Sequence, residues 1–403
     1  MPLALAEVDG LDQFITDAYA GPLTEAVAGL LPTRLREKLR SRQEPGIPRE
    51  RVKCLWTLTA LEHLRHRLGY SPSVTFAKLD RQFSLAAAAR ARRTRSNLYL
   101  YSPYAWEAFT SHYTHEPRKI LFQFHPHPAL ERRILVEDRA KYPFVQQTFD
   151  EEAGEFLNEE MRRRSRDCWG YADRVICASA FTKESLVEVG ARRELCEIIP
   201  YGIDMPHYAA DEPAPETFKA LFVGNGSQRK GLHHLLIAWR QASLPQNSQL
   251  TLVCRQIDPG IEALIRKIAN VHLIHGASGF ELTSLYKKSS LFVMPSLVEG
   301  FGFVYLEALA QGCPVLGTPN TGLPDLGTEA DAIWQVQSGQ IDQLGARLEF
   351  LARCLPGDSK VRARAQACAA RWTWPKFRAG IRASLSQDKP NRHSRNRAAE
   401  QHT

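Results

Sequence analysis

Residues 291–316 constrain the fold more than any other part of the 403-residue chain. The segment opens with the apolar run 291–294, which is typical of a buried strand. Glu299 and a loop with two glycines follow, and apolar residues then recur at helical spacing over 303–311. Gly312 stands where a helix ends, and a second apolar run begins just after it. The order strand, glycine loop, helix, strand predicts a parallel sheet with helical crossovers.

The glycine loop suits an anion that lies between two hydroxyl-rich groups. Glycines let backbone N–H groups approach a ligand closely, and a helix N-terminus adds the positive end of its dipole. Two carboxylates flank the loop, Glu299 within it and Glu307 in the helix that follows. Because carboxylates repel phosphate, we expect them to meet hydroxyl groups, and a nucleotide sugar carries phosphates between two polyols. The alternative is that both glutamates are ordinary solvated side chains.

The same motif resembles the signature of the retaining nucleotide-sugar glycosyltransferases of family four. The residues that carry the resemblance are P-S-x-x-E-G-F-G-x-x-x-L-E-A-L-A-x-G-C-P-V at 295–315. The resemblance implies the GT-B fold, an α/β fold in which two Rossmann-like domains face a cleft and a C-terminal helix crosses back to the first domain. It also implies that Glu299 contacts the donor sugar and that Glu307 holds the ribose hydroxyls. The donor-binding loop would comprise Gly300, Phe301 and Gly302.

A second glycine-rich loop lies earlier, at 224–231, between an apolar run and a helical pattern. Glycines, the adjacent cations Arg229 and Lys230 and a helix start form a phosphate site on physical grounds. The spacing is not that of a Walker loop, so ATP hydrolysis is not implied. The loop resembles the family's V-G-x-x-x-x-R-K-G segment, which implies that Gly224, Arg229 and Lys230 bind the donor diphosphate. Asn225 stands where many members carry arginine, and the alternative for the cations is a surface pair in a turn.

A histidine pair, His125 and His127, follows the predicted strand 119–124. Ligands of doubly wound sheets sit at the carboxyl ends of strands, so we expect His125 to donate to a sugar or phosphate oxygen of the donor. His127 is the second choice for this role. Related transferases often carry a histidine at a comparable place. The alternative is a loop histidine with a local hydrogen bond.

The resemblance covers residues 97–385 and includes A-D-x-V-I-x-x-S-x-F-T at 172–182 and I-P-Y-G-I-D at 199–204. It implies an opening buried strand with a glycine loop, which residues 1–96 lack, so either this first strand is missing or the chain begins differently. The resemblance and the composition predict five segments: an N-terminal acceptor-side domain at 1–204, a linker at 205–217, a nucleotide-sugar-binding Rossmann-like domain at 218–374, a crossing helix at 375–385 and a disordered tail at 386–403.

The net charge of +8 favours anionic partners. Basic residues at 34–42 alternate with leucines at helical spacing, and more basic residues lie at 90–95. These clusters predict either docking on an anionic membrane surface or a solvated helix face packed on its own domain. No pattern typical of nucleic-acid recognition accompanies them. The eight cysteines are scattered without a C-x-x-C pair, which predicts core residues in a reducing compartment.

No run approaches the roughly 18 apolar residues of a membrane span, and the acidic N-terminus does not resemble a secretory signal. We therefore expect a cytoplasmic protein, on the inner face of the membrane if the basic clusters dock there.

These observations predict a hexosyltransferase-like enzyme that moves a sugar from a nucleotide-diphosphate sugar to a glycan or lipid-linked acceptor, with retention. Surface polysaccharide or glycolipid biosynthesis is the expected setting. We expect no cofactor and no catalytic metal, because no acidic D-x-D pair follows a predicted strand. The alternatives are a non-catalytic GT-B protein that binds nucleotide sugars or acts as a scaffold, and an epimerase or glycan phosphorylase of the same fold.

Overall fold

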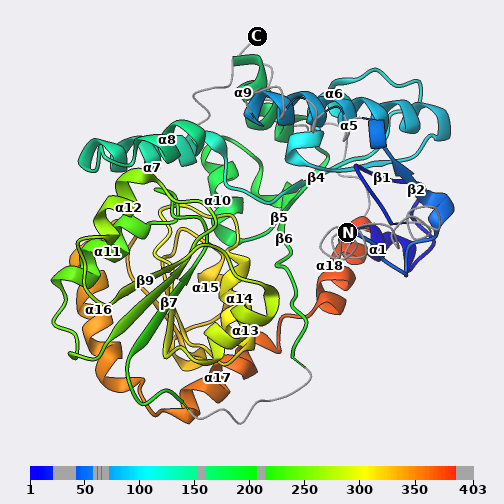
Figure 1. The fold of residues 1–403 in the computed structure, drawn as a ribbon. Helices are drawn as coiled ribbons and strands as arrows, with labels where there is room; N and C mark the ends of the chain where they lie inside the picture. The colour runs from blue at the N-terminus through cyan, green and yellow to red at the C-terminus, as the bar shows by residue number, and fades with distance from the viewer. Residues whose placement is uncertain are drawn as a thin grey trace, which may run out of the picture. The chain divides into compact units, whose positions relative to one another are not determined.

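The computed structural model describes residues 1–20, 42–57, 61, 65, 72–152, 159–206 and 214–386 (Figure 1). Its internal contacts divide the chain into two compact units, each assembled from separate stretches of sequence. Unit 1 comprises Met1–Phe122, Phe156–Val175 and Arg378–Thr403, and unit 2 comprises Gln123–Glu155 and Ile176–Phe377.

Unit 2 contains a six-stranded sheet in the order β12-β11-β10-β7-β8-β9, and every neighbouring pair is parallel. Its strands are β7 (Lys219–Val223), β8 (Gln249–Val253), β9 (Val271–Ile274), β10 (Leu291–Val293), β11 (Val315–Gly317) and β12 (Ile333–Gln335). The central strands β10 and β11 are buried at every position, which explains their unbroken apolar sequences. In chain order this arrangement is that of a doubly wound nucleotide-binding sheet.

Helices cover both faces of this sheet (Figure 1). Helices α12 and α16 pack with α11 on one face, and α17 packs with α14 on the other. The helices of this region are α11 (Leu232–Gln241), α12 (Pro259–Ile265), α13 (Gly279–Lys287), α14 (Phe303–Ala310), α15 (Leu323–Leu326), α16 (Ile341–Cys354) and α17 (Ser359–Ala369), with the short helix η5 (Glu329–Asp331). The buried faces of α11 and α16 carry leucines at helical spacing, which accounts for their packing.

The strand order reverses between β7 and β10, which are adjacent in the sheet but separated by three crossovers in the chain. A crevice forms at such a switch point because the two strands send their following helices to opposite faces. The loops that leave these two strands are the two glycine-rich loops singled out in the sequence. The fold therefore brings together two segments that lie about 70 residues apart along the chain.

The remaining elements of unit 2 come from residues 123–152 and 176–198. They are α7 (Pro128–Lys141), α8 (Gln146–Glu152), α10 (Ala180–Glu188), η4 (Arg193–Leu195) and β6 (Cys196–Ile198). Leu135 of α7 and Phe149 of α8 form a buried cluster with Leu297 and Val298, which directly precede Glu299. Apolar contact thus fixes the start of the glutamate loop against α7.

A second sheet has the order β3-β4-β5-β6, and its strands β4 (Lys119–Gln123) and β5 (Arg174–Cys177) have residues in both units. Helix α18 (Trp374–Ser386) is also shared. The other elements of unit 1 are α1 (Pro2–Ala6), β1 (Phe14–Thr16), η1 (Arg49–Arg51), β2 (Val52–Cys54), α5 (Pro72–Thr94), β3 (Leu98–Tyr101), η2 (Ser102–Tyr104), α6 (Trp106–Thr110), α9 (Glu159–Asp167) and η3 (Cys168–Tyr171). In unit 1, β1 pairs with β2 and β3 pairs with β4, both in parallel.

Most elements predicted between residues 97 and 371 are confirmed, among them the strand that is β4 and the helix that is α11. The helix predicted over 149–171 is shorter at its C-terminal end, because α9 ends at Asp167 and the short helix η3 follows; α8 is described as far as Glu152, and residues 153–158 lie outside the described part. Helix α7 was missed because its sequence is largely charged and follows two His-Pro pairs. The domain boundaries at 204, 217, 374 and 385 stay predictions.

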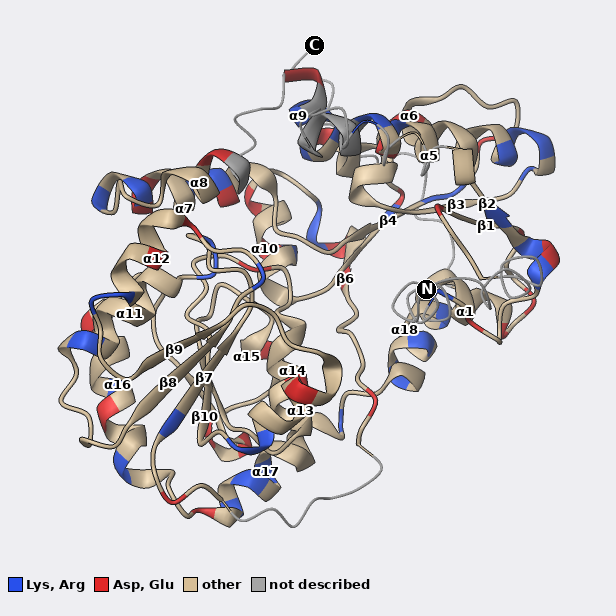
Figure 2. Cartoon of the chain, viewed as in Figure 1, with Lys and Arg blue, Asp and Glu red and all other residues tan. Residues whose placement is uncertain are grey.

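The basic cluster at 34–42 lies outside the described residues except for Arg42, which forms an ion pair with Asp17. Basic residues outnumber acidic ones along α5, whereas α9 carries both kinds (Figure 2). At the end of α5, Arg90 donates to both carboxylate oxygens of Asp12, at 2.9 and 2.6 Å. For Arg90, this contact favours packing on its own domain over docking on a membrane surface. In the described part of the chain, no helix is long and apolar enough to span a bilayer.

Candidate functional site

The two glycine-rich loops lie against each other at the switch point. Gly231 has a φ of +66° and begins α11, and a Cβ built there would lie 2.0 Å from the carbonyl oxygen of Pro295. The amide of Leu297 donates to the carbonyl oxygen of Arg229 at 2.9 Å. Only glycine at position 231 permits this approach, because a side chain would occupy the space of the neighbouring backbone. The sequence therefore places the cation loop and the glutamate loop in direct contact.

Glu299 pairs directly with both predicted donor-binding cations. Its Oε2 atom lies 3.0 Å from Nη1 of Arg229 and also accepts from Nζ of Lys230. Only 9% of its side chain is exposed. Burial acts to raise the pKa of Glu299, but the charges of Arg229 and Lys230 outweigh it and hold that pKa well below its usual range. The carboxylate is therefore ionised at neutral pH, and it neutralises part of the positive charge of the loop.

Gly300 packs against the end of β4. A Cβ at this position would lie 1.8 Å from the carbonyl oxygen of Phe124 and 3.1 Å from Cα of His125. This contact places the backbone of His125 beside the glutamate loop. The pKa of His125 is lowered to about 4, mainly by burial and further by the charge of Arg229, so its imidazole is neutral at neutral pH. A neutral imidazole offers one N–H donor and one acceptor, as the predicted role requires.

His127, the second choice, caps the helix that follows it. Its Nδ1 atom accepts from the amide of Ala129 at 3.2 Å and caps the N-terminus of α7. Its own amide donates to Oγ of Ser185 at 2.8 Å. These contacts and its burial assign His127 to the structure of the turn that ends in α7.

Two hydroxyl groups of α10 orient the peptide bond after Gly300. Oγ of Ser179 and Oγ1 of Thr182 both donate to the carbonyl oxygen of Gly300. In a trans peptide the C=O and the following N–H point in opposite directions, so the amide of Phe301 is directed away from α10. Within the described part of the chain, the amides of Phe301 and Gly302 make no hydrogen bond. Two backbone donors are thus available at the start of α14, as an anion site requires.

Glu307 lies in the middle of α14 and has a different environment. Its Oε2 atom accepts from the hydroxyl of the buried Tyr286 of α13 at 3.2 Å. Burial raises the pKa of Glu307, and the hydrogen bond from Tyr286 acts against this rise. No lysine or arginine among the described residues forms an ion pair with it. Such a carboxylate suits neutral hydroxyl donors.

Gly224 ends β7 with a φ of +156°, and its amide donates to the carbonyl oxygen of Val253 at 3.0 Å. The next residue, Asn225, places its amide nitrogen 3.5 Å from Oε1 of Gln256. Gly224 therefore starts the cation loop as expected, and Asn225 contacts a neighbouring loop.

The structure brings Glu299, Arg229, Lys230 and the backbone of His125 together, and it places Gly300, Phe301 and Gly302 in the same loop. The sequence analysis missed Ser179, Thr182 and Tyr286. Ser179 and Thr182 belong to the segment at 172–182 that resembles the family motif. The motif therefore marked both residues, but no role could be assigned to them from the sequence. Tyr286 gave no signal, because nothing in the sequence shows which side chain faces Glu307.

The order of the six-stranded sheet is that of a Rossmann-like domain, and the likeness to solved structures gives the class: this is a GT-B protein with two Rossmann-like domains. Among solved structures, HepE of Anabaena in complex with UDP and glucose resembles the chain with a TM-score of 0.54. That match covers 96% of each chain at 16% identity, and it supports the fold alone.

Residues 217–353, less than half of the chain, match the family model Glycosyl transferases group 1. The chain is 26% identical over 176 residues to an MMP alpha-(1->4)-mannosyltransferase of Mycolicibacterium hassiacum, a match of 42% of this chain and 43% of the relative. It is 32% identical over 152 residues to a GDP-mannose:cellobiosyl-diphosphopolyprenol alpha-mannosyltransferase of Xanthomonas oryzae pv. oryzae, a match of 36% and 40%. The chain spans less than half of the length of these curated relatives.

Proposed function

We propose that this protein is a retaining glycosyltransferase that moves a sugar from a nucleotide-diphosphate sugar to an acceptor hydroxyl. The observation that carries the proposal is the convergence of Arg229, Lys230 and two unpartnered amides at the switch point of the sheet. These groups suit a diphosphate, because fixed N–H donors and cations stabilise the charge that develops on a leaving phosphate. The family match over 217–353 and the names of the relatives support the same reaction.

In the proposed complex, the donor diphosphate takes the place of the Glu299 carboxylate on Arg229 and Lys230. Its oxygens also accept from the amides of Phe301 and Gly302. The released Glu299 accepts from hydroxyls of the donor sugar, and neutral His125 donates to a sugar or phosphate oxygen. Glu307 accepts from the ribose hydroxyls. Because these residues compensate the charge of the diphosphate, we propose that the transfer needs no metal ion.

Retention follows from a front-face route. The bond between the anomeric carbon and the leaving phosphate breaks as the acceptor oxygen bonds to the same face. The departing phosphate oxygen takes the acceptor proton, and no covalent enzyme intermediate forms. The name of one relative includes GDP-mannose and a diphosphopolyprenol-linked acceptor, which supports a glycan or lipid-linked acceptor here. We therefore propose a role in surface polysaccharide or glycolipid biosynthesis, on the cytoplasmic side of the membrane.

A thermal-shift screen of the full chain against UDP-, GDP- and ADP-sugars identifies the donor. With that donor, Lys230→Ala and Glu299→Gln should each lower turnover by at least about 10²-fold, the typical effect of removing a preorganised charge or hydrogen bond. Lys267→Ala removes an exposed lysine of unit 2 and is the matched control. Wild-type turnover in both site variants would contradict the proposed site. A Tm shift with a nucleotide sugar but no turnover would support a binding protein instead.

A further inference from the structure

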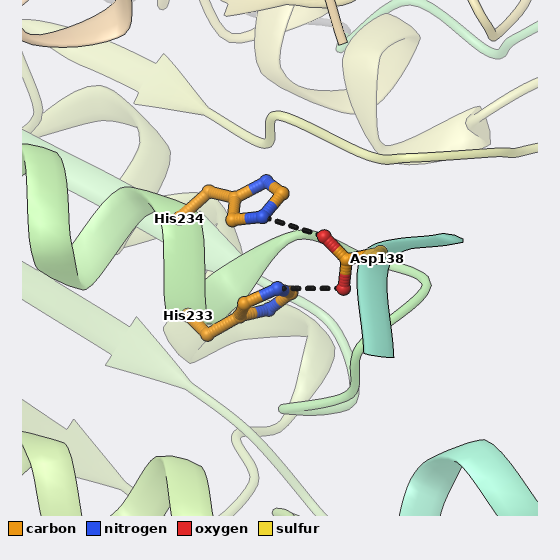
Figure 3. A group of neighbouring side chains, drawn as sticks. All are labelled: Asp138, His233 and His234. Carbon is orange, nitrogen blue, oxygen red and sulfur yellow. Dashed lines mark hydrogen bonds and ion pairs between the residues drawn. The ribbon is translucent and has the colours of Figure 1, made fainter. Parts of the chain in front are cut away.

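Asp138 of α7 is a buried carboxylate that two consecutive histidines of α11 contact (Figure 3). Nε2 of His233 lies 3.0 Å from its Oδ2 atom, and Nε2 of His234 lies 2.8 Å from its Oδ1 atom. All three side chains are buried, and the three potential ligand atoms lie within 4.8 Å of one another. This group lies outside the proposed donor site and has no part in the proposed reaction.

The negative charge of Asp138 has no cationic partner of its own. No lysine or arginine among the described residues forms an ion pair with it. A buried charge is costly unless it is paired or coordinates a metal ion. The neutral donors around it, which include Nε2 of Gln228 at 2.8 Å from Oδ2, solvate this charge without neutralising it.

The orientation of His234 is not that of a hydrogen-bond donor to Asp138. Its Nε2 atom is close to Oδ1, but it forms no hydrogen bond, so its N–H direction is not aimed at that oxygen. Among the described residues, this leaves the Nε2 lone pair of His234 available to a metal ion, whereas Nε2 of His233 does form a hydrogen bond with Oδ2 of Asp138. With bonds of about 2.1 Å, neighbouring ligand atoms lie about 3.4 Å apart in tetrahedral coordination and about 3.0 Å apart in right-angled coordination. The two separations to Asp138, 2.8 and 3.0 Å, are close to the right-angled value, and all three ligand atoms lie within 4.8 Å of one another.

We propose that Asp138, His233 and His234 bind a divalent first-row transition-metal ion. Two imidazoles and a carboxylate are a ligand set that suits zinc and its neighbours, and zinc accepts more than four ligands. Gln228 holds the carboxylate from outside, since its amide nitrogen bridges Asp138 and the carbonyl oxygen of Leu135 at 2.9 Å. Such a hydrogen bond to a ligating carboxylate is usual in metal sites. The rings of both histidines also pack edge-to-face on Tyr142, which limits their rotation.

The position of the ion gives it a structural role. Helix α7 begins three residues after His125, and α11 begins two residues after Lys230. An ion shared by the two helices fixes the segments that carry the histidine and the cations of the proposed donor site. The ion is not in contact with the donor in this proposal, so it does not change the metal-independent chemistry proposed above.

Metal analysis of the full chain tests the proposal directly. Protein that is loaded with Zn²⁺ and dialysed against metal-free buffer should retain about one ion per chain, measured by inductively coupled plasma mass spectrometry. Asp138→Asn and His234→Gln, which keep the side-chain shapes, should reduce the retained metal to background. His272→Gln changes an exposed histidine of the same unit and should retain it. Circular dichroism confirms that each variant is folded.

Two further measurements separate the metal site from a hydrogen-bonded network of neutral histidines. A strong chelator should lower the Tm of the wild type but not that of Asp138→Asn. Co²⁺ added to chelated wild-type protein should give visible absorption bands that His234→Gln lacks. No retained Zn²⁺ or Co²⁺ in the folded wild type, or equal retention in His234→Gln, would overturn the proposal. Neither readout requires glycosyl transfer, so its outcome is independent of the proposed function.

Discussion

The two ends of the segment from Glu299 to Glu307 differ in how they are held. Residues of three other elements fix the loop end: the cation loop pairs with Glu299, Phe124 packs on Gly300, and the hydroxyls of α10 hold the Gly300 carbonyl. Among the described residues, Glu307 at the helix end has one side-chain partner, Tyr286. The sequence motif gives both ends the same residue type, but only the surrounding structure makes one a fixed part of a charged network.

The electrostatic consequence is opposite at the two ends. Cations hold the pKa of Glu299 below its usual range, whereas burial raises the pKa of Glu307. The Glu299 carboxylate is therefore ionised at any moderate pH, and its contribution to the site depends on the geometry of its contacts. The charge of Glu307 at the helix end depends on pH, because this carboxylate protonates more readily than that of a solvated glutamate.

Gly300→Ala should break the loop end and have the largest effect. The new Cβ would lie 1.8 Å from the carbonyl oxygen of Phe124, so either the loop or β4 must move. We expect a loss of about 3 kcal/mol of stability from overpacking and a fall in donor turnover of at least about 10²-fold. Melting curves and donor turnover measure the two effects.

Gly279→Ala is the matched control for this substitution, because a Cβ there meets no atom within 4 Å. Wild-type turnover in Gly300→Ala, with the control also unchanged, would show that the loop end is not fixed by this contact.

Loss of the α10 hydroxyls should loosen the same end without a steric clash. Ser179→Ala and Thr182→Val each remove one hydrogen bond to the Gly300 carbonyl, worth about 1 kcal/mol, or about fivefold in kcat/KM. The double variant should lose more than the two single effects combined, because the single variants keep one hydroxyl on the carbonyl. Steady-state kinetics with the donor varied measure this.

Ser248→Ala removes a buried hydroxyl that has no hydrogen-bond partner among the described residues, and it serves as the control. A double variant that is no worse than Ser179→Ala would argue against a shared role in orienting the peptide.

Tyr286→Phe should change only the helix end and have the smallest effect, a few-fold rise in the donor KM with kcat unchanged. In the proposed complex the ionised Glu307 accepts from ribose hydroxyls, so donor affinity should fall as pH drops through its raised pKa. The hydrogen bond from Tyr286 lowers that pKa, so its removal should move the midpoint of the KM–pH profile upward.

A Glu307→Gln background provides the control for the pH effect, because it removes the titrating group. There, Tyr286→Phe should leave the pH profile unchanged. A midpoint that shifts in this background as well would assign the titration to another group.

The sequence predicted the local part of this site well. Apolar periodicity and glycines are short-range signals, so β10, its loop and α14 were predicted in nearly their observed positions. The resemblance assigned the two loops to one ligand. The order of the six-stranded sheet explains how both loops can meet it, because β7 and β10, which the loops follow, are adjacent. The pairing of Glu299 with both cations was not predicted, because the sequence assigned the carboxylate and the cations to different parts of the donor.

Contacts between residues that lie far apart in the sequence could not be predicted. Asp138 lies on a helix that the pattern did not predict, and its two histidine partners lie almost a hundred residues further along the chain. Metal motifs are recognised by the spacing of ligands within one segment, and here only the adjacent pair His233 and His234 is local. The contact between Gly231 and Pro295 is likewise a property of the strand order.

The ion pairs that Glu299 makes with Arg229 and Lys230 also bear on turnover after the chemical step. A carboxylate tethered beside these cations is an internal competitor for them, present at high effective concentration. It lowers the affinity of the site for any diphosphate, and it lowers the affinity for the nucleoside diphosphate product as much as that for the donor. Glu299 can re-form its pairs as the nucleoside diphosphate departs, so in the proposed complex the residue that contacts the donor sugar would also promote release of the product.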